Sequence, residues 1–335
     1  MTSLVIQTAF LGDVVLTTPL LEVLAARHGP VDVVTTPAAA PLIETHPAVR
    51  RVIPYDKKGR DRGLGGLLRL ASALRAEQYE CAYLPHRSLR TALAAWLARI
   101  PQRVGFDDGW PSLYTDVRQR PQESHEIDRV LALGGVAVPH ARPALHVTLA
   151  DRAATEGFLR EHGMRERFVA LAPGSIWGSK RWPYYKELAE RLAGSAGILV
   201  VGGPEDAGLA AEITEAVARS GGQAVSGCRR LSVRQSAEAI RRAAVLVTND
   251  SAPLHFAQAV DTPTVAIFGS TTPRFGFGPR GPRDRVVQLD GLLCRPCSAH
   301  GPPSCPLGHH LCMKSLSVQN VLQAIEETGA LRRRD

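Results

Sequence analysis

Short apolar runs alternate along the chain with longer stretches whose apolar residues recur at helical spacing. Runs of four or five apolar residues are typical of strands buried in a parallel sheet, and the helical stretches between them are typical of crossovers. In the first half, strands are predicted at residues 4–7, 31–35 and 81–84, and helices at 14–27, 64–75 and 91–99. This order predicts a doubly wound α/β domain.

The alternation stops at residues 139–143 and then resumes. An amphipathic stretch at 151–162 is interpreted as a linker helix. After it, strands are predicted at 168–171, 198–201, around Val225, at 245–248 and 264–268, and helices at 184–192, 207–218, 233–242 and 256–260. A final helix at 318–328 could pack back across the first half. A length of 335 residues suffices for two cores. We therefore expect two Rossmann-like domains, 1–150 and 151–335, facing a cleft.

Composition and charge bear on where the protein works and on which partners it binds. The first apolar run lacks a basic segment before it and ends at Asp13, and no apolar stretch is long enough to cross a bilayer, so a cytoplasmic protein is expected. The net charge of +8 fits an anionic partner, either nucleic acid or a phosphorylated membrane surface. Codon bias towards arginine explains it equally well. Aromatic residues make up only 5% and are not interleaved with the arginines, which argues against a base-stacking surface.

Two strand-to-helix turns lack the common nucleotide fingerprints. The first reads Phe10-Leu11-Gly12-Asp13, and the second reads Ala172-Pro173-Gly174-Ser175-Ile176-Trp177-Gly178-Ser179-Lys180. Neither contains G-x-G-x-x-G or a Walker A loop, which argues against NAD enzymes and P-loop NTPases.

A third turn indicates an anion site. It reads Thr248-Asn249-Asp250-Ser251-Ala252-Pro253-Leu254-His255 and joins a predicted strand to a predicted helix. Ser251 is expected to cap that helix, and Pro253 falls in its first turn, where a missing N–H costs little. The free N–H groups and the positive end of the helix dipole favour a phosphate. The alternative is that Asp250 and Ser251 only cap the helix.

Four motifs, taken in order, resemble the ADP-heptose:lipopolysaccharide heptosyltransferases. They are Gly12-Asp13, Pro173-Gly174-Ser175 with Lys180-Arg181-Trp182-Pro183, Gly202-Gly203-Pro204-Glu205, and Asp250-Ser251-Ala252-Pro253-Leu254-His255. The match is closest to the heptosyltransferase II type, supported by Phe268-Gly269-Ser270-Thr271 and Gly276-Phe277-Gly278-Pro279. The resemblance runs nearly end to end. It implies the GT-B fold and inverting transfer of heptose from ADP-L-glycero-β-D-manno-heptose to the lipopolysaccharide inner core, without a catalytic metal.

The resemblance also assigns roles to single residues. Asp13 is the expected general base, although an aspartate at a helix start is also a common cap. Lys180 is expected to neutralise the diphosphate of the leaving ADP. Glu205 is expected at the ribose, Leu231 at the adenine, and Asp250 at sugar hydroxyls. His255 is expected at the donor phosphate or heptose. The remaining donor-site predictions are Gly174, Ser175, Ser179, Ser251 and Ala252.

Basic residues in the first half are the expected acceptor contacts. Lys57, Lys58, Arg60 and Arg62 precede a glycine-rich segment, 63–66, interpreted as a loop, with Arg87 and Arg90 expected opposite. They would cover an acceptor rich in carboxylates and phosphates. The alternative is a solvated loop. The expected partners are thus the donor and a lipopolysaccharide acceptor at the membrane surface, with no nucleic acid, and a peripheral position at the inner membrane is a further option.

Four cysteines leave two interpretations open. Cys294, Cys297, Cys305 and Cys312 have the spacing C-x₂-C-x₇-C-x₆-C, which fits a four-thiolate zinc site better than disulfides in a reducing compartment. Four free thiols are an equal alternative, and no catalytic role is expected because the segment lies outside the four motifs. Two rival functions remain at this point: a related GT-B enzyme that uses another nucleotide sugar, and a zinc-containing nucleic-acid-binding protein.

Overall fold

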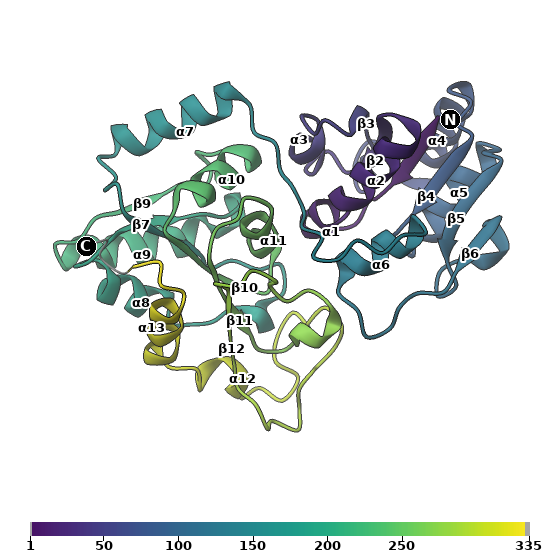
Figure 1. The fold of residues 1–335 in the computed structure, drawn as a ribbon. Coiled ribbons are helices and arrows are strands. Elements are labelled where there is room, and N and C mark those ends of the chain that lie inside the picture. Colours follow the sequence, from purple (N-terminus) through teal and green to yellow (C-terminus); the bar gives the residue numbers. More distant parts are fainter. Residues whose placement is uncertain (1, 332–335) are drawn as a thin grey trace. The chain divides into compact units, whose positions relative to one another are not determined.

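The computed structural model describes residues 2–331, and the chain divides into two units, Met1–His146 and Val147–Asp335. The division falls four residues before the predicted boundary at residue 150. Each unit is built on a six-stranded sheet in which all strand pairs are parallel. Because parallel strands need crossovers, helices cover both faces of such a sheet. The doubly wound class predicted for both halves is therefore confirmed (Figure 1).

The first unit has the strand order β3-β2-β1-β4-β5-β6. Its strands are β1 (Ser3–Ile6), β2 (Val31–Thr35), β3 (Val49–Pro54), β4 (Cys81–Leu84), β5 (Gln102–Phe106) and β6 (Asp116–Arg118). Its helices are α1 (Leu11–Leu16), α2 (Thr18–His28), α3 (Ala40–Ile43), α4 (Gly63–Ala76), α5 (Leu89–Leu97) and α6 (Glu126–Leu133), with a 3₁₀ turn at Pro111–Leu113.

Two predictions for the first unit are corrected. The helix predicted at 14–27 is two helices, because the chain leaves α1 at Thr17 and Pro19 stands in the first turn of α2, where it cannot donate a hydrogen bond. The segment 63–66 is not a loop but the first turn of α4, in which an alanine-like Cβ at Gly66 would lie 2.1 Å from the Asp61 carbonyl oxygen. The glycines therefore allow a close approach of the chain to itself.

The second unit has the strand order β12-β11-β10-β7-β8-β9. Its strands are β7 (Phe168–Ala172), β8 (Gly197–Val200), β9 (Ala224–Ser226), β10 (Val245–Asn249), β11 (Thr264–Phe268) and β12 (Arg285–Gln288). Its helices are α7 (Leu149–Glu161), α8 (Tyr185–Leu192), α9 (Ala207–Arg219), α10 (Val233–Arg242), α11 (Ala252–Ala259), α12 (Leu311–Lys314) and α13 (Val318–Glu327), with 3₁₀ turns at Gly178–Lys180, Pro204–Asp206 and Pro273–Phe275.

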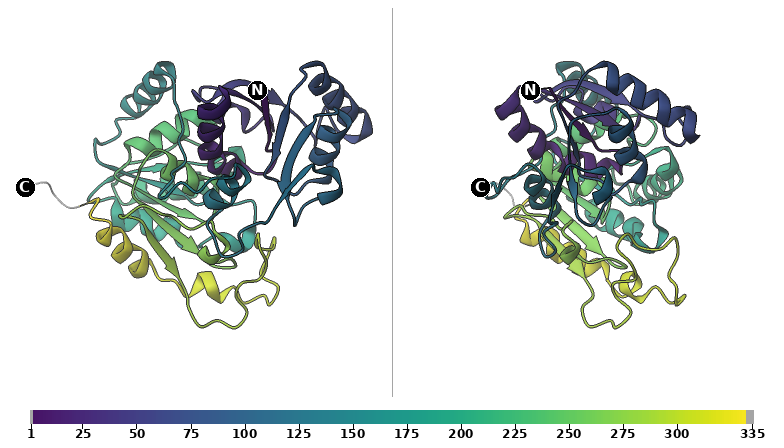
Figure 2. Two further views of the ribbon diagram at one scale, coloured as in Figure 1. Left: turned by 45° about the vertical axis from the view of Figure 1, so that its right-hand side comes forward. Right: turned by 90° about the vertical axis from the view of Figure 1, so that its right-hand side faces the viewer.

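Two helices of the second unit pack within that unit. Helix α7 is not a free linker, since it packs on α10 and the Arg234 guanidinium donates to its Asp151 carboxylate over 2.8 Å. Helix α13 buries Val321 and Ile325 in the core of the second unit. A long loop separates β12 from α12 and is drawn in yellow in Figure 2. In residues 2–331 no helix is long and apolar enough to cross a membrane.

Candidate active site in two half-sites

Asp13 lies in the first turn of α1, directly after the central strand β1. Its Oδ2 accepts the N–H of Phe10 over 3.1 Å. The turn is fixed from below, because Thr17 donates its hydroxyl to the Asp13 carbonyl over 2.7 Å and receives the Gln7 amide over 3.2 Å. The Asp13 carboxylate is thus held at the start of α1 by a backbone N–H.

The protein around Asp13 makes it a better base than a free aspartate. The pKa of its carboxyl is raised from 3.8 to about 6, first by burial and then by the charge of Glu126, while hydrogen bonds from the Phe10 and Asp13 backbone and the charge of Arg120 oppose the rise. A general base works best when its pKa lies just below the working pH. The half-site of the first unit is therefore suited to proton abstraction near neutral pH.

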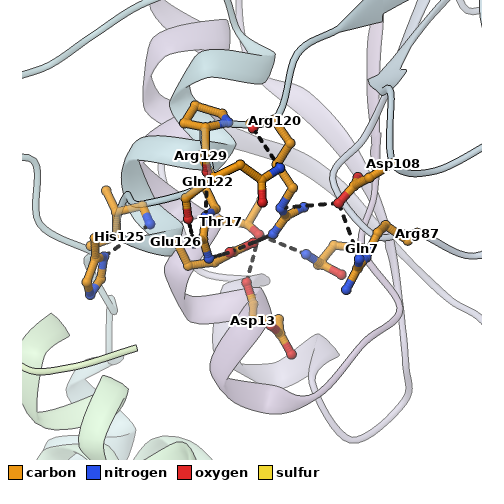
Figure 3. A network of polar contacts seen from close by, with 12 residues as sticks. Gln7, Asp13, Thr17, Arg87, Asp108, Arg120, Gln122, His125, Glu126 and Arg129 are labelled. Atoms are coloured by element: carbon orange, nitrogen blue, oxygen red, sulfur yellow. Dashed lines mark hydrogen bonds and ion pairs between the residues drawn. The ribbon is translucent and has the colours of Figure 1, made fainter. Parts of the chain in front are cut away.

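A network of charged side chains beside Asp13 holds Glu126 in place (Figure 3). Arg120 reaches both Glu126 oxygens, at 2.8 and 2.7 Å, and Arg129 reaches one of them at 3.2 Å. Glu126 is only 6% exposed and stands at the first position of α6. No sequence motif marks these three residues, and they meet Asp13 only because α6 packs near α1.

Two acids order the basic loop, which we call the basic flap, residues 57–62. The Asp56 N–H donates to Asp61 Oδ2 over 3.1 Å. The Arg90 guanidinium donates to the Tyr55 hydroxyl and, over 2.6 Å, to the Asp61 carbonyl. Arg90 therefore anchors the flap, and its role as an acceptor contact stays a prediction. The flap is an ordered turn.

The other basic residues of this half divide into anchored and exposed groups. Lys57 donates to the Thr8 carbonyl over 2.7 Å, and burial lowers the pKa of its amine. It thus ties the flap to the chain just before Asp13. Lys58 is partly exposed, while Arg60 and Arg62 are exposed. Arg87 is also exposed and pairs with Asp108 over 3.2 Å. Lys58, Arg60, Arg62 and Arg87 thus remain the candidates for binding an anionic acceptor.

In the second unit, Lys180 and Asp250 form a nearly buried ion pair. The lysine Nζ lies 2.6 Å from Asp250 Oδ2, each side chain is 10% exposed, and the Thr271 hydroxyl donates to the same oxygen over 2.7 Å. The structure thus brings together residues from three motifs that were predicted separately. Lys180 is held as a fixed cation, and Asp250 is held by two donors, as a buried charge requires.

Asn249 fixes the turn that carries the predicted donor motif. Its Oδ1 accepts the Trp182 N–H over 3.1 Å, and its Nδ2 donates to the Pro173 carbonyl over 2.8 Å. At Gly174 a Cβ would lie 2.1 Å from the Asp206 carboxylate, so a larger residue would have to displace that side chain. Asp206, which no motif marked, is the acid that is buried here. Asn249 and Asp206 shape the turn and leave its outer side to a ligand.

The start of α11 keeps the features of an anion site, with one correction. Pro253 stands in the first turn as predicted, but the Ser251 hydroxyl accepts no N–H from that turn and lies 3.3 Å from the Thr248 hydroxyl. Ser251 is therefore the N-cap residue of α11, as predicted, but its side chain makes no capping hydrogen bond. The N–H groups of the first turn, starting at Ala252, do not donate to that side chain and are suited to an anionic ligand.

His255 is buried in the first turn of α11. Burial lowers the pKa of its imidazole, so the ring is neutral near pH 7. The Gln258 amide donates to the Gly278 carbonyl over 3.1 Å, so its oxygen faces His255 Nδ1 at 3.3 Å and takes that N–H. His255 Nε2 is then a hydrogen-bond acceptor. An acceptor suits a sugar hydroxyl and not a phosphate oxygen.

The remaining predicted donor-site residues differ in their exposure and in their hydrogen bonds. Glu205 is exposed in the 3₁₀ turn after β8, and Leu231 is partly buried against Gly227. Ser175 accepts the Trp177 N–H over 3.3 Å. Ser179 is only 1% exposed, and its hydroxyl donates to the Pro302 carbonyl over 2.6 Å. Its hydroxyl hydrogen is bonded within the protein, and a role of Ser179 at the donor phosphates stays a prediction.

The cysteine loop, residues 294–312, packs on the donor motifs. His310 Nε2 lies 2.8 Å from the Ser179 carbonyl, the Cys297 N–H donates to the Ser270 carbonyl over 2.8 Å, and Arg295 donates to the Thr271 carbonyl over 2.8 Å. The segment is outside the four motifs in sequence but lies against Ser179, in the turn of the second motif, and against the supporting segment 268–271. Only the tertiary structure shows this contact.

Metal-ligand geometry is not preformed at the thiols. The charges of neighbouring cysteines raise the pKa of Cys297 and of Cys312, so the four thiols lie near one another. Within residues 2–331, however, the one group of three ligand atoms within 4.8 Å is Glu22, His46 and His146. That group is a poor metal site as it stands, because His46 Nδ1 accepts the Ala48 N–H over 3.2 Å, so Nε2 carries the proton.

A Rossmann-type unit with a carboxylate base, followed by one with a nucleotide-type turn, is the plan of GT-B glycosyltransferases. The profile of glycosyltransferase family 9 (heptosyltransferase) matches residues 67–304. The chain belongs to this family. It is 28% identical to lipopolysaccharide heptosyltransferase 2 of Escherichia coli over 85% of the chain and 87% of that protein. It is 29% identical to lipopolysaccharide heptosyltransferase 1 of Pseudomonas aeruginosa over 88% and 85%.

Similarity to a solved structure confirms the fold. The structure of E. coli ADP-heptose lipopolysaccharide heptosyltransferase II superposes with a TM-score of 0.78 and 26% identity, covering 99% of this chain and 98% of that one. The predicted GT-B fold and the predicted family are therefore both confirmed, and the protein is a glycosyltransferase of the lipopolysaccharide heptosyltransferases. The alternative of a zinc-containing nucleic-acid-binding protein is wrong.

Proposed function

We propose that the protein transfers heptose from ADP-L-glycero-β-D-manno-heptose to the lipopolysaccharide inner core with inversion, as a heptosyltransferase of type II. The observation that carries the donor assignment is the Lys180–Asp250 pair, fixed by Thr271 beside the turn at Gly174. The similarity to E. coli heptosyltransferase II, whose donor is ADP-heptose, supports it.

The base of the reaction is Asp13. An acceptor hydroxyl attacks the anomeric carbon from the face opposite the departing ADP, which inverts the configuration. The Asp13 carboxylate takes the hydroxyl proton, and its pKa of about 6 keeps it ionised near neutral pH.

The leaving ADP is stabilised by Lys180 and by the start of α11. The charge of Lys180 is balanced by the carboxylate of Asp250, which also orients the ammonium group. The diphosphate would be a second anion beside this ammonium group. Asp250 itself would repel the phosphates, so its place is at sugar hydroxyls. His255 Nε2, a neutral acceptor, fits another hydroxyl of the same sugar. No catalytic metal is needed in this scheme.

Titration and transfer assays test this function. Calorimetric titration with ADP, UDP and GDP should show tightest binding of ADP, with EDTA present or absent. Selective binding of UDP or GDP would support the alternative, a GT-B enzyme that uses another nucleotide sugar. Transfer to inner-core acceptors with and without a first heptose separates type II from type I, which the two similar relatives leave open.

We also propose that Cys294, Cys297, Cys305 and Cys312 bind one structural zinc ion. Small rearrangements of a loop rich in Pro and Gly would close the thiols around the metal, and the bound form would stabilise a loop that packs on the donor motifs. Elemental analysis of untagged protein tests it, because about one zinc per chain is expected and a metal-free protein would leave four free thiols.

We further propose that the protein works in the cytoplasm at the inner membrane. Its acceptor is a lipid, and the net charge of +8 favours an anionic surface. Fractionation of cells should recover the protein from the cytoplasmic and inner-membrane fractions.

A further inference from the structure

Two neighbouring helices of the first unit expose large apolar side chains. On α4, Leu64 is 67% exposed and Leu68 is 49% exposed. On α5, Leu89 is 40% exposed and Trp96 is 49% exposed. Single exposed leucines are ordinary, but four large apolar residues on two adjacent helices need an explanation.

The topology places α4 and α5 in one layer. Helix α4 joins β3 to β4 and α5 joins β4 to β5, and both steps move in the same direction across the sheet. Right-handed crossovers that move the same way lie on the same face. The two helices pack against each other, and their inner sides, including Leu67 and Ala92, belong to one core (Figure 1). The exposed residues are thus on the outer side of one layer.

The spacing lines these residues up along the two helices. Leu64 and Leu68 are four positions apart, and Leu89 and Trp96 are seven apart, so each pair shares a helix face. Both helices follow the carboxyl ends of their strands, so Leu64 and Leu89 lie at the edge of the sheet where β1 leads to Asp13.

The part of the chain that carries this layer has an excess of basic residues. Residues 56–108 contain ten basic residues and six acids, and two of these acids, Asp61 and Asp108, pair with Arg69 and Arg87. Helix α4 has Arg69 and Arg75 and no acid, and α5 has no acid either. A second copy of this chain on this surface would bring the two sets of arginines together, so self-association is disfavoured. Apolar side chains surrounded by arginines instead match a surface of lipids with anionic head groups.

We propose that the outer side of α4 and α5 docks on an anionic lipid bilayer. Leu64, Leu68, Leu89 and Trp96 enter the head-group region, where tryptophan is favoured, and the arginines contact lipid phosphates. The proposal deepens the proposed function in one respect, since it presents the acceptor edge of the first unit to the membrane that holds the lipid acceptor.

Vesicle sedimentation with the full chain tests the proposal. Wild type should bind vesicles of phosphatidylethanolamine and phosphatidylglycerol at 3:1, and bind pure phosphatidylcholine at least tenfold more weakly. The variant Leu64→Ser/Leu68→Ser/Trp96→Ser should bind the anionic vesicles at least tenfold more weakly than wild type. The control variant Leu149→Ser/Ile176→Ser removes two residues of the second unit that are 81% and 70% exposed, and should bind as wild type does.

Two further measurements keep the outcomes separate. Thermal melting and ADP titration check that the triple variant folds, and a conservative Leu64→Ala/Leu68→Ala variant replaces it if it does not. Transfer to a water-soluble, deacylated acceptor should be unchanged in the variant, whereas absence of transfer in wild type would contradict the proposed function and leave the docking result standing. Equal vesicle binding by variant and wild type, or a wild-type dimer that the triple variant abolishes, would overturn the proposal.

Discussion

Replacing Asp13 by Asn should abolish most transfer and make the first unit more stable. Asn keeps an oxygen that can accept the Phe10 N–H but cannot take a proton from the acceptor. Loss of a general base costs on the order of 10²–10⁴ in rate. ADP affinity should stay unchanged, because the donor contacts are on the second unit.

The gain in stability follows from the raised pKa. The folded protein holds the Asp13 proton up to about pH 6, whereas an unfolded chain releases it near 3.8. A rise of about two pKa units corresponds to about 3 kcal/mol, so the ionised carboxylate lowers the free energy of unfolding by up to that amount. The loss is absent below pH 4, where the carboxyl is protonated in both states, and is complete above pH 6. Asn avoids it.

Melting curves and rate profiles measure both effects. The Tm difference between Asp13→Asn and wild type should be near zero at pH 4, grow up to pH 6, and stay constant above, with an upper bound of about 6–12 °C for a unit of this size. Wild-type kcat/KM should rise with a midpoint near pH 6. Glu126→Gln should shift that midpoint downwards. Wild-type turnover by Asp13→Asn, or a Tm difference independent of pH, would refute the reasoning.

Three other predictions concern the donor, the acceptor and the thiols. Lys180→Ala should weaken ADP binding by about 1.5–3 kcal/mol, the value of a charge-assisted hydrogen bond, while EDTA leaves wild-type transfer unchanged; activity lost in EDTA and restored by magnesium would contradict this. Arg60→Ala/Arg62→Ala should raise the acceptor KM and weaken its salt dependence without changing the donor KM, and an unaltered acceptor KM at low salt would mean a solvated loop only. Cys294→Ser/Cys297→Ser should lose zinc, lower the Tm and raise the donor KM; metal-free wild type with a variant of equal stability would rule the zinc out.

The repeating apolar runs determined the class of the fold. Strands such as β7 and β8 are buried on both faces and therefore read as continuous apolar segments. The strands that the pattern missed, β3 and β6 among them, carry arginines and are partly exposed, so their place in the sheet depends on a neighbouring strand and not on their own composition. The motifs likewise identified the family, because their order along the chain is a property of the sequence alone.

The surroundings of those motifs were decided only by the tertiary structure. The pKa of Asp13 is raised by burial and by Glu126, which lies near it because α6 packs near α1. Arg90 and Ser179 are predicted as ligand contacts, and the fold also bonds both of them to protein carbonyls. Lys180 and Asp250 are 70 positions apart, and their 2.6 Å contact exists because β7 and β10 are neighbours. A sequence fixes which side chains are present, whereas burial and charge depend on which distant segments the sheet places side by side.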